Sequence, residues 1–189
     1  MARILVSLGI EKVRLTGGEP LLRSGLVEMV AELARLRTAC RPGSPLLDAG
    51  DGGLPLDIAL TTNGHLLKSL AAPLATAGLS RITVSMDAVD PQIFERIPRV
   101  PRSFEHVQAG LRAAQAAGLN PVKINCVLMR GFNDAQIEPF AEFSRSQGVV
   151  VRFIECMPLE EPSTAPDARN WSPQAVVRMD EIVARLNAW

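Results

Sequence analysis

The chain has 189 residues, and its 20 Lys and Arg balance its 20 Asp and Glu, so the formal net charge is zero. A hydrophobic fraction of 47% and a charged fraction of 21% are typical of a globular domain and exclude a disordered or collagen-like chain. The absence of a basic surplus argues against a nucleic-acid-binding protein. No apolar run reaches the roughly 18 residues that a membrane span needs. We therefore expect neither a nucleic-acid partner nor a membrane association.

Five segments predict β-strands, because each is rich in Val, Ile, Leu or Thr and is bounded by Gly, Pro or Asn. They are residues 12–16, 57–62, 81–86, 121–128 and 149–155. Helical patterns begin at Leu26 with Ser24 as the expected N-cap, at Phe104 after Ser103, and near Ile137. The repeating order of strand and helix predicts an α/β fold with a parallel sheet, either open or curled into a barrel.

Two segments interrupt this alternation. Residues 38–56 are rich in Pro and Gly and predict a flexible surface insertion. Residues 158–173 are rich in Pro and acidic residues, which suits either a lid over a site or a solvated linker. We interpret residues 1–189 as one domain that carries these two irregular segments.

The cysteines indicate a reduced, intracellular protein. The chain has three cysteines, Cys40, Cys126 and Cys156. Because their number is odd and they are widely spaced, we expect no disulfide framework. The first residues lack the apolar stretch and cleavage site of a signal peptide. We expect a cytoplasmic location, or a mitochondrial one if the source is eukaryotic.

Side chains of the predicted strands separate into two faces, because residues i and i+2 of a strand point to the same side. One face is apolar and comprises Val13, Leu15, Ile58, Leu60, Ile82, Val84, Val122, Ile124, Val151 and Phe153. The other is polar and comprises Arg14, Thr16, Ala59, Thr61, Thr83, Ser85, Lys123, Asn125 and Arg152. Its three cations need a counter-charge. Asp87 is the only acid that follows the same alternation at the carboxyl end of a strand. We therefore favour an anionic ligand inside a curled sheet as the counter-charge. The alternative is an open sheet whose polar face is exposed to solvent.

Two turns follow predicted strands directly. Gly17 and Gly18 allow close approach of a ligand to the backbone, and Glu19 can accept hydrogen bonds. A Thr-Thr-Asn-Gly turn follows the second predicted strand at residues 61–64. Each could be a plain turn, but ligands of parallel α/β folds bind at the carboxyl ends of strands.

These motifs resemble those of a known family. The sequence VRLTGGEP at residues 13–20 resembles the glycine-rich S-adenosylmethionine motif of radical SAM enzymes. Together with this motif, five others resemble the GTP 3′,8-cyclase family, which opens molybdenum-cofactor biosynthesis. They are TTNG at 61–64, VSMD at 84–87, VKIN at 122–125, MRGFND at 129–134 and VRFIECMP at 151–158.

The resemblance implies an incomplete (β/α)6 partial barrel and a set of ligand contacts. Gly18, Ser85 and Met157 would contact S-adenosylmethionine, and Glu19 would lie near its amino group. GTP would be contacted by Arg14, Thr61 and Lys123, with Arg152 near its phosphates. In the family, an iron–sulfur cluster cleaves S-adenosylmethionine to a 5′-deoxyadenosyl radical, which takes hydrogen from C3′ of GTP before C3′ bonds to C8. A homodimer is a further possibility.

The sequence departs from the family in its cysteines. The family holds its 4Fe–4S cluster with a C-x3-C-x2-C motif, which these 189 residues lack, so we expect no metal ligand here. We expect the first strand and the cluster loop to be missing and the chain to be an inactive fragment of a radical SAM lyase. The alternatives are another radical SAM enzyme, such as a peptide-modifying one, or a non-catalytic nucleotide-binding pseudoenzyme. Arg14, Thr61 and Lys123 favour a nucleoside triphosphate over a peptide.

Overall fold

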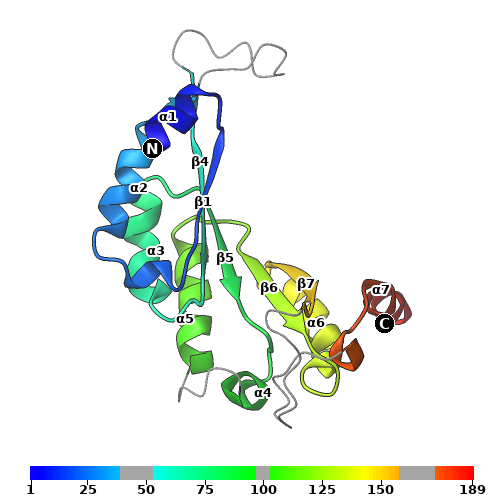
Figure 1. Ribbon diagram of the computed structural model, residues 1–189. Coiled ribbons are helices and arrows are strands. Elements are labelled where there is room, and N and C mark those ends of the chain that lie inside the picture. The colour runs from blue at the N-terminus through cyan, green and yellow to red at the C-terminus, as the bar shows by residue number, and fades with distance from the viewer. Residues whose placement is uncertain (39–52, 97–102, 158–172) are drawn as a thin grey trace. The chain divides into compact units, whose positions relative to one another are not determined.

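The computed structural model describes residues 1–38, 53–96, 103–157 and 173–189. Five strands form one sheet in the order β1-β4-β5-β6-β7 (Figure 1). They are β1 (Lys12–Leu15), β4 (Asp57–Thr62), β5 (Arg81–Ser85), β6 (Lys123–Leu128) and β7 (Val150–Glu155). β1 is parallel to β4, and β6 is parallel to β7. The α/β class and all five predicted strands are thus confirmed, with bounds that agree to within two residues.

Helices alternate with these strands. They are α1 (Ala2–Ser7), α2 (Leu26–Ala34), α3 (Leu67–Thr76), α4 (Pro91–Arg96), α5 (Ser103–Ala116), α6 (Ile137–Gln147) and α7 (Met179–Ala188). Single 3-10 turns lie at Pro20–Leu22, Asp134–Gln136 and Pro173–Ala175. The prediction that Ser24 caps α2 is wrong, because Gly25 occupies the N-cap with a φ of 72° and no side chain caps the helix. Pro139 lies in the first turn of α6, where its missing N–H has no helical partner to lose.

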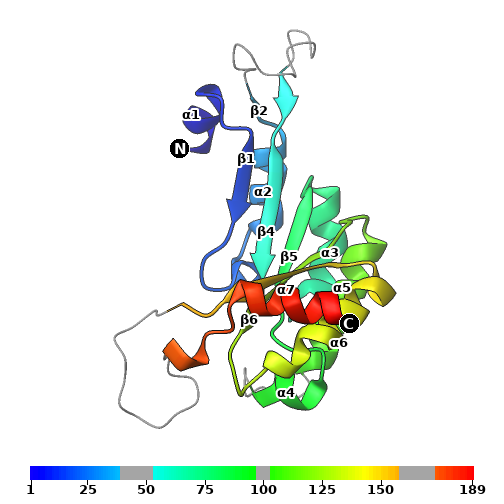
Figure 2. The same cartoon turned by 90° about the vertical axis from the view of Figure 1, so that its right-hand side faces the viewer.

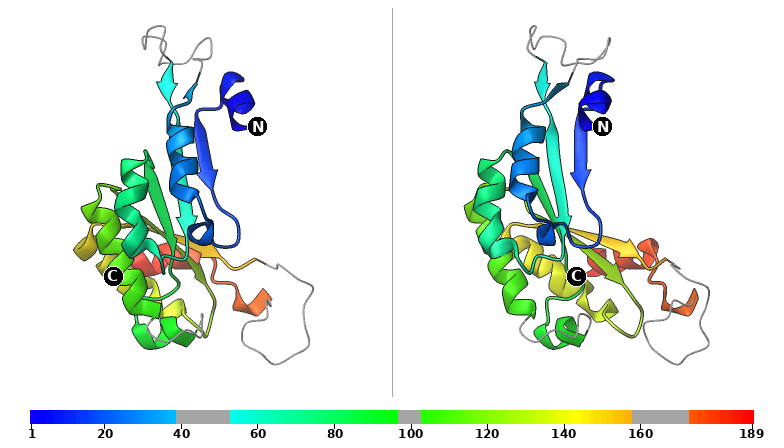
Figure 3. Two further views of the ribbon diagram at one scale, coloured as in Figure 1. Left: turned by 90° about the vertical axis from the view of Figure 1, so that its left-hand side faces the viewer. Right: turned by 60° about the vertical axis from the view of Figure 1, so that its left-hand side comes forward.

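The chain forms two compact units. The N-terminal unit comprises residues 1–83 and 106–122, and the C-terminal unit comprises residues 84–105 and 123–189. In the N-terminal unit, α2 packs against α3 and β4 (Figure 3). Its most buried side chains include those of Val30, Ile58, Leu60, Leu67 and Leu74, each fully inaccessible to solvent. This apolar layer fixes the opposite, polar face of β1 and β4.

In the C-terminal unit, α6 packs against both β7 and α7 (Figure 2). The rings of Phe140 on α6 and Phe153 on β7 meet edge to face, with centroids 5.9 Å apart. Arg185 of α7 forms an ion pair with Glu138 of α6 and donates to the Asp134 carbonyl. Glu155 at the end of β7 accepts a hydrogen bond from the Met179 amide, at the start of α7. These contacts fasten α7 to the sheet and to α6.

The register of the strands confirms the predicted separation of faces within each unit. Arg14 pairs with Ala59 across β1 and β4. Asn125 pairs with Arg152 across β6 and β7, and Cys126 pairs with Phe153 on the opposite face. Since paired residues share a face, Lys123, Asn125 and Arg152 lie on one side of β6 and β7.

The two irregular segments are only partly described. The ends of the predicted insertion are joined by a short antiparallel ladder between β2 (Arg37–Thr38) and β3 (Leu54–Pro55). Residues 39–52, which include Cys40, and residues 158–172 lie outside the described residues. None of the described helices combines the length and apolarity that crossing a membrane requires.

Candidate functional site

Arg14 lies on the polar face of the N-terminal unit and reaches across its neighbouring strands. Its Nη1 donates to the hydroxyl of Thr61 on β4 at 2.9 Å and to that of Thr83 on β5 at 3.3 Å. Both partners are neutral, and no carboxylate of the described residues forms an ion pair with Arg14. The guanidinium is therefore held in place without being neutralised, which suits the binding of an anion.

Glu19 joins the two glycine-containing turns of the same unit. Its Oε1 accepts from the Leu21 amide at 3.0 Å and from the Thr62 hydroxyl at 2.6 Å. Its Oε2 accepts from the Asn63 amide at 2.7 Å. A carboxylate has about four acceptor positions, so three of them bind the chain itself and one, on Oε2, stays available to a ligand.

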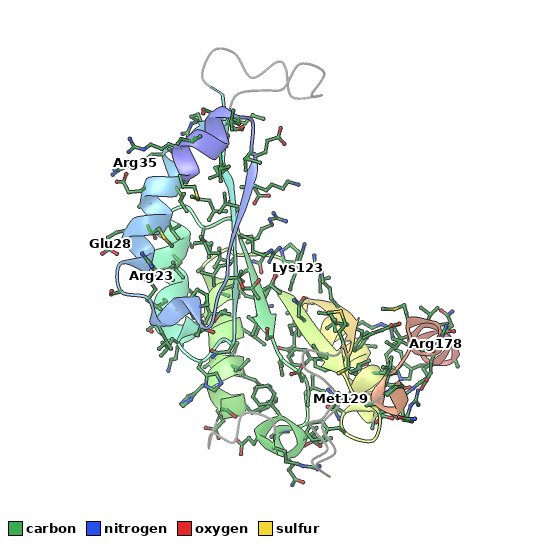
Figure 4. All side chains as sticks on the ribbon, viewed as in Figure 1. Arg23, Glu28, Arg35, Lys123, Met129 and Arg178 are labelled. Atoms are coloured by element: carbon green, nitrogen blue, oxygen red, sulfur yellow. The ribbon has the colours of Figure 1, made fainter. Side chains whose placement is uncertain are left out.

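Gly17 and Gly18 leave the backbone between β1 and Glu19 uncovered. A methyl group placed on either glycine would meet no neighbouring atom within 4 Å. A cavity of about 280 Å³ adjoins this turn and is lined by both glycines, Glu19, Arg23 and Met29, among others. Arg23, labelled in Figure 4, was not predicted from the sequence, because a single exposed Arg directly after a turn carries no distinctive signal.

The turn after β4 is also packed against α5. Gly110 of α5 lies so close that a Cβ would be 2.8 Å from the Gly64 carbonyl oxygen and 2.9 Å from the Leu67 Cβ. The rings of His65 and His106 face each other edge-on, with centroids 6.4 Å apart. Burial, followed by the nearby His106, lowers the pKa of His65, and Glu19 opposes this shift. This pair could not be predicted from the sequence, since the two histidines are 41 residues apart.

The C-terminal unit contributes a second group of polar side chains. Lys123 begins β6 (Figure 4), and the neighbouring Asn125 has a buried Oδ1 without a hydrogen-bond partner among the described residues. Arg152 on β7 and Ser85 at the end of β5 are exposed. Met157 is 63% exposed, two residues beyond β7. Exposed polar groups and one unsatisfied amide oxygen are consistent with a surface that binds a polar ligand.

The predicted site residues therefore divide between the two units. Arg14, Gly18, Glu19 and Thr61 belong to the N-terminal unit, where Arg14 contacts Thr61 directly. The others, Ser85, Lys123, Arg152 and Met157, belong to the C-terminal unit. Asp87, the one acid in phase at the carboxyl end of a predicted strand, binds the backbone, since its Oδ1 accepts from the Val127 amide at 2.8 Å. Burial raises the pKa of this carboxyl, and the Val127 hydrogen bond opposes the rise.

The described thiols do not fit an iron–sulfur cluster. Cys126 is fully buried, its Sγ contacts the Asp87 carbonyl, and burial raises its pKa. Burial also raises the pKa of Cys156. No cluster of three or more His, Cys, Asp or Glu in the described ranges could hold a metal ion. We therefore derive no chemical step through a cluster on these residues.

Comparison with known proteins identifies the family. The model of the radical SAM superfamily matches residues 1–144. The chain belongs to the radical SAM superfamily. Enzymes of this superfamily use S-adenosylmethionine and a 4Fe–4S cluster, which agrees with the cofactors expected from the glycine-rich motif.

Curated relatives also confirm the resemblance to one branch. The chain is 40% identical over 188 residues to the GTP 3′,8-cyclase of Acidothermus cellulolyticus, which covers the whole chain and 46% of the relative. It is 41% identical over 188 residues to that of Xanthomonas axonopodis pv. citri, covering the whole chain and 50% of the relative. The chain thus spans about half the length of the curated relatives that it matches.

Solved structures confirm the fold. One is described as native anSMEcpe with bound AdoMet and Cp18Cys peptide; it has a TM-score of 0.63, 20% identity, and coverage of 88% of this chain and 44% of that one. Coproporphyrinogen III oxidase from Escherichia coli, described as a radical SAM enzyme, has a TM-score of 0.58, 12% identity, and coverage of 94% and 38%. The predicted partial-barrel arrangement of strands and helices is therefore the fold of this superfamily.

Proposed function

We propose that this chain supplies nucleotide-binding and S-adenosylmethionine-binding residues of a GTP 3′,8-cyclase. The reaction would convert GTP to 3′,8-cyclo-7,8-dihydro-GTP, the first step of molybdenum-cofactor biosynthesis. The observation that carries the proposal is Arg14, a guanidinium held by the hydroxyls of Thr61 and Thr83 and without an ion pair to any carboxylate in the described part of the chain. The similarity to bacterial GTP 3′,8-cyclases over the whole chain points to GTP as the anion. It also favours a location in the bacterial cytoplasm.

Charged and hydroxyl side chains would contact GTP. Arg14 and Thr61 would bind it from β1 and β4, and Lys123 and Arg152 from β6 and β7, with Arg152 near the phosphates. Arginine suits phosphate because its planar donors match two oxygens at once. The Arg14–Thr61 hydrogen bond would keep the guanidinium in one orientation before the ligand arrives, which lowers the entropy lost on binding.

Four residues would contact S-adenosylmethionine, as the resemblance to the family implies. Gly18 offers an uncovered backbone, Ser85 an exposed hydroxyl, and Met157 an exposed apolar side chain. The one remaining acceptor position of Glu19 would face the amino group of the ligand. When bound, S-adenosylmethionine supplies the 5′-deoxyadenosyl group that reacts with GTP.

Calorimetric titration of GTP into the chain and into Lys123→Met tests the proposal. Loss of the charged contact of Lys123 to GTP should weaken binding by about tenfold, equivalent to roughly 1.4 kcal/mol. Lys68→Met, which removes an exposed Lys on α3, is the matched control and should bind GTP like the unaltered chain. Equal affinity of the Lys123 variant and its control would refute the assignment of Lys123.

A non-catalytic nucleotide-binding protein is the second candidate, because no group of three or more His, Cys, Asp or Glu among the described residues could hold a metal ion. Anaerobic incubation with iron and sulfide, followed by S-adenosylmethionine and a reductant, separates the two. Stoichiometric iron together with 5′-deoxyadenosine would show that this chain is catalytic by itself. GTP binding without iron or 5′-deoxyadenosine would assign it a binding role alone.

A further inference from the structure

The end of β5 is tied to β6 by side chains where the backbone ladder stops. The Met86 amide donates to the Asn125 carbonyl at 2.9 Å, which is a backbone contact between the two segments. One residue later, the Asp87 carboxylate accepts from the Val127 amide at 2.8 Å. The Asn133 Nδ2 then donates to both the Asp87 carbonyl, at 2.8 Å, and the Val127 carbonyl, at 2.9 Å. Side-chain hydrogen bonds thus join the two segments beyond the backbone hydrogen bond between Met86 and Asn125.

Asn133 makes three hydrogen bonds that few side chains could replace. It is only 1% exposed, and besides its two donor contacts its Oδ1 accepts from the Met129 amide at 2.7 Å. Asp has the same shape but no donor, so it would place a carboxylate oxygen against two carbonyls. A buried carbonyl that loses its donor costs about 1–3 kcal/mol. The carboxamide is therefore specific for this position.

Gln136 holds the next part of the same loop. It is 5% exposed, and its Oε1 accepts from the amides of Val89 and Asp90, each at 3.0 Å. Asp90 in turn accepts at Oδ1 from the Gln92 and Ile93 amides in the first turn of α4. Residues 87–90 are thus fixed from the end of β5 to the start of α4.

We propose that Asn133 is a positioning residue that fixes Ser85 for ligand binding by locking the end of β5 onto β6. Ser85 is the last residue of β5 and lies two residues before the carbonyl that Asn133 binds. Ser85 itself is exposed and has no hydrogen bond among the described residues that would hold its hydroxyl. The position of that hydroxyl therefore depends on the strand end. The inference rests on the proposed function, in which Ser85 contacts S-adenosylmethionine.

Asn133→Asp tests this role with two readouts. Hydrogen exchange of residues 85–90 should accelerate, and calorimetry should show that S-adenosylmethionine binds about tenfold more weakly, because small misplacements of a contact group reduce affinity and rate strongly. Asn187→Asp makes the same chemical change at an exposed position of α7 and should alter neither quantity. Unchanged exchange, or faster exchange with unchanged affinity, would overturn the proposal.

Double substitution distinguishes positioning from a general loss of stability. If Asn133 acts through Ser85, then Ser85→Ala should weaken binding in the unaltered chain but add little in the Asn133→Asp background. Additive losses would overturn the proposal. If Asn133→Asp does not fold, Asp87→Ala, which removes only the carboxylate that binds Val127, replaces it in both measurements. If the unaltered chain binds no S-adenosylmethionine, the proposed function fails, and the exchange of residues 85–90 alone decides whether Asn133 positions Ser85.

Discussion

Glu19 accepts a hydrogen bond of 2.6 Å from the hydroxyl of Thr62, which joins the glycine turn after β1 to the turn after β4. The Thr62 hydroxyl also accepts from the Gly64 amide at 3.0 Å, so one buried oxygen organises both turns. Thr62 is 2% exposed. In the proposed function these turns carry the contacts to S-adenosylmethionine and GTP, so the pair sets the spacing between two ligand-binding segments.

Thr62→Val should lower the free energy of unfolding by about 1–3 kcal/mol, because the Glu19 carboxylate and the Gly64 amide both lose a buried partner. Valine keeps the shape of threonine, so packing changes little. Urea denaturation followed by circular dichroism measures the effect. Thr76→Val, at an exposed position of α3, is the control and should stay within about 0.5 kcal/mol of the unaltered chain. A loss no larger than the control's would contradict the organising role of Thr62.

Gly110→Ala should destabilise the N-terminal unit although alanine is the better helix former. Alanine in a helix ordinarily stabilises by about 0.5–1 kcal/mol relative to glycine. Here its Cβ would lie 2.8 Å from the Gly64 carbonyl oxygen, so α5 and the turn must separate. We expect a net loss of about 1–3 kcal/mol, as for an overpacked core.

Ala116→Gly in the exposed last turn of the same helix measures how much alanine stabilises α5 relative to glycine where no close contact intervenes. It should lower stability by about 0.5–1 kcal/mol, which gives the scale for α5 itself. If Gly110→Ala melts at a higher temperature than the unaltered chain, then α5 does not lie as close to Gly64 as the structure shows.

Asp87→Asn should stabilise the C-terminal unit at neutral pH and have less effect at acidic pH. Burial raises the pKa of Asp87 in the folded state above its ordinary value of 3.8. The Asp87 carboxyl therefore binds a proton more tightly in the folded chain than in the unfolded chain. The stability that this protonation contributes is present at low pH and is lost as the pH rises through the raised pKa of Asp87. Asparagine avoids this loss and still offers an acceptor to the Val127 amide.

Urea denaturation of the unaltered chain and Asp87→Asn at several pH values measures this difference. The stability advantage of the variant should grow as the pH rises from about 3 to 7. An advantage that is constant across this range, or that shrinks with rising pH, would mean that the carboxyl is not the cause.

His106→Gln should raise the pKa of His65. Burial makes the largest contribution to the lowered pKa of His65 and would persist, whereas the smaller electrostatic contribution of His106 would be removed. The chain has two histidines, so the variant leaves one imidazole to follow by NMR titration. The expected result is a partial shift back toward 6.5. An unchanged or lower pKa would show that the two rings do not interact in solution.

Sequence patterns predicted the strands and their two faces well, because alternation with a period of two is a local property of a strand. They placed Arg14 and Thr61 on one face, where the two side chains now contact each other. The N-cap of α2 was wrong because a glycine in the left-handed region competes with Ser24 at that position. Alternation also says nothing of side chains in turns and loops.

Contacts between loops that are distant in the sequence could be identified only from the structure. The bonds of Glu19 to Thr62 and of Asn133 to Asp87 join residues 43 and 46 positions apart in the chain. Their formation depends on the backbone path of turns, which residue type alone does not determine. α3 was not predicted, and it contains Pro73 in its interior, a residue that ordinarily argues against a helix.

Hydrogen exchange of the full chain with and without GTP tests the central claim most directly, because it reports where the nucleotide binds. We predict slower exchange at residues 14–19 and 61–65, which carry Arg14, Glu19 and Thr61, and at the start of β6 around Lys123. Residues 179–188 of α7, which carry none of the assigned contacts, should be unaffected and serve as the internal reference. Protection confined to α7, or no protection anywhere at saturating GTP, would contradict the assignment of the polar face as the GTP site.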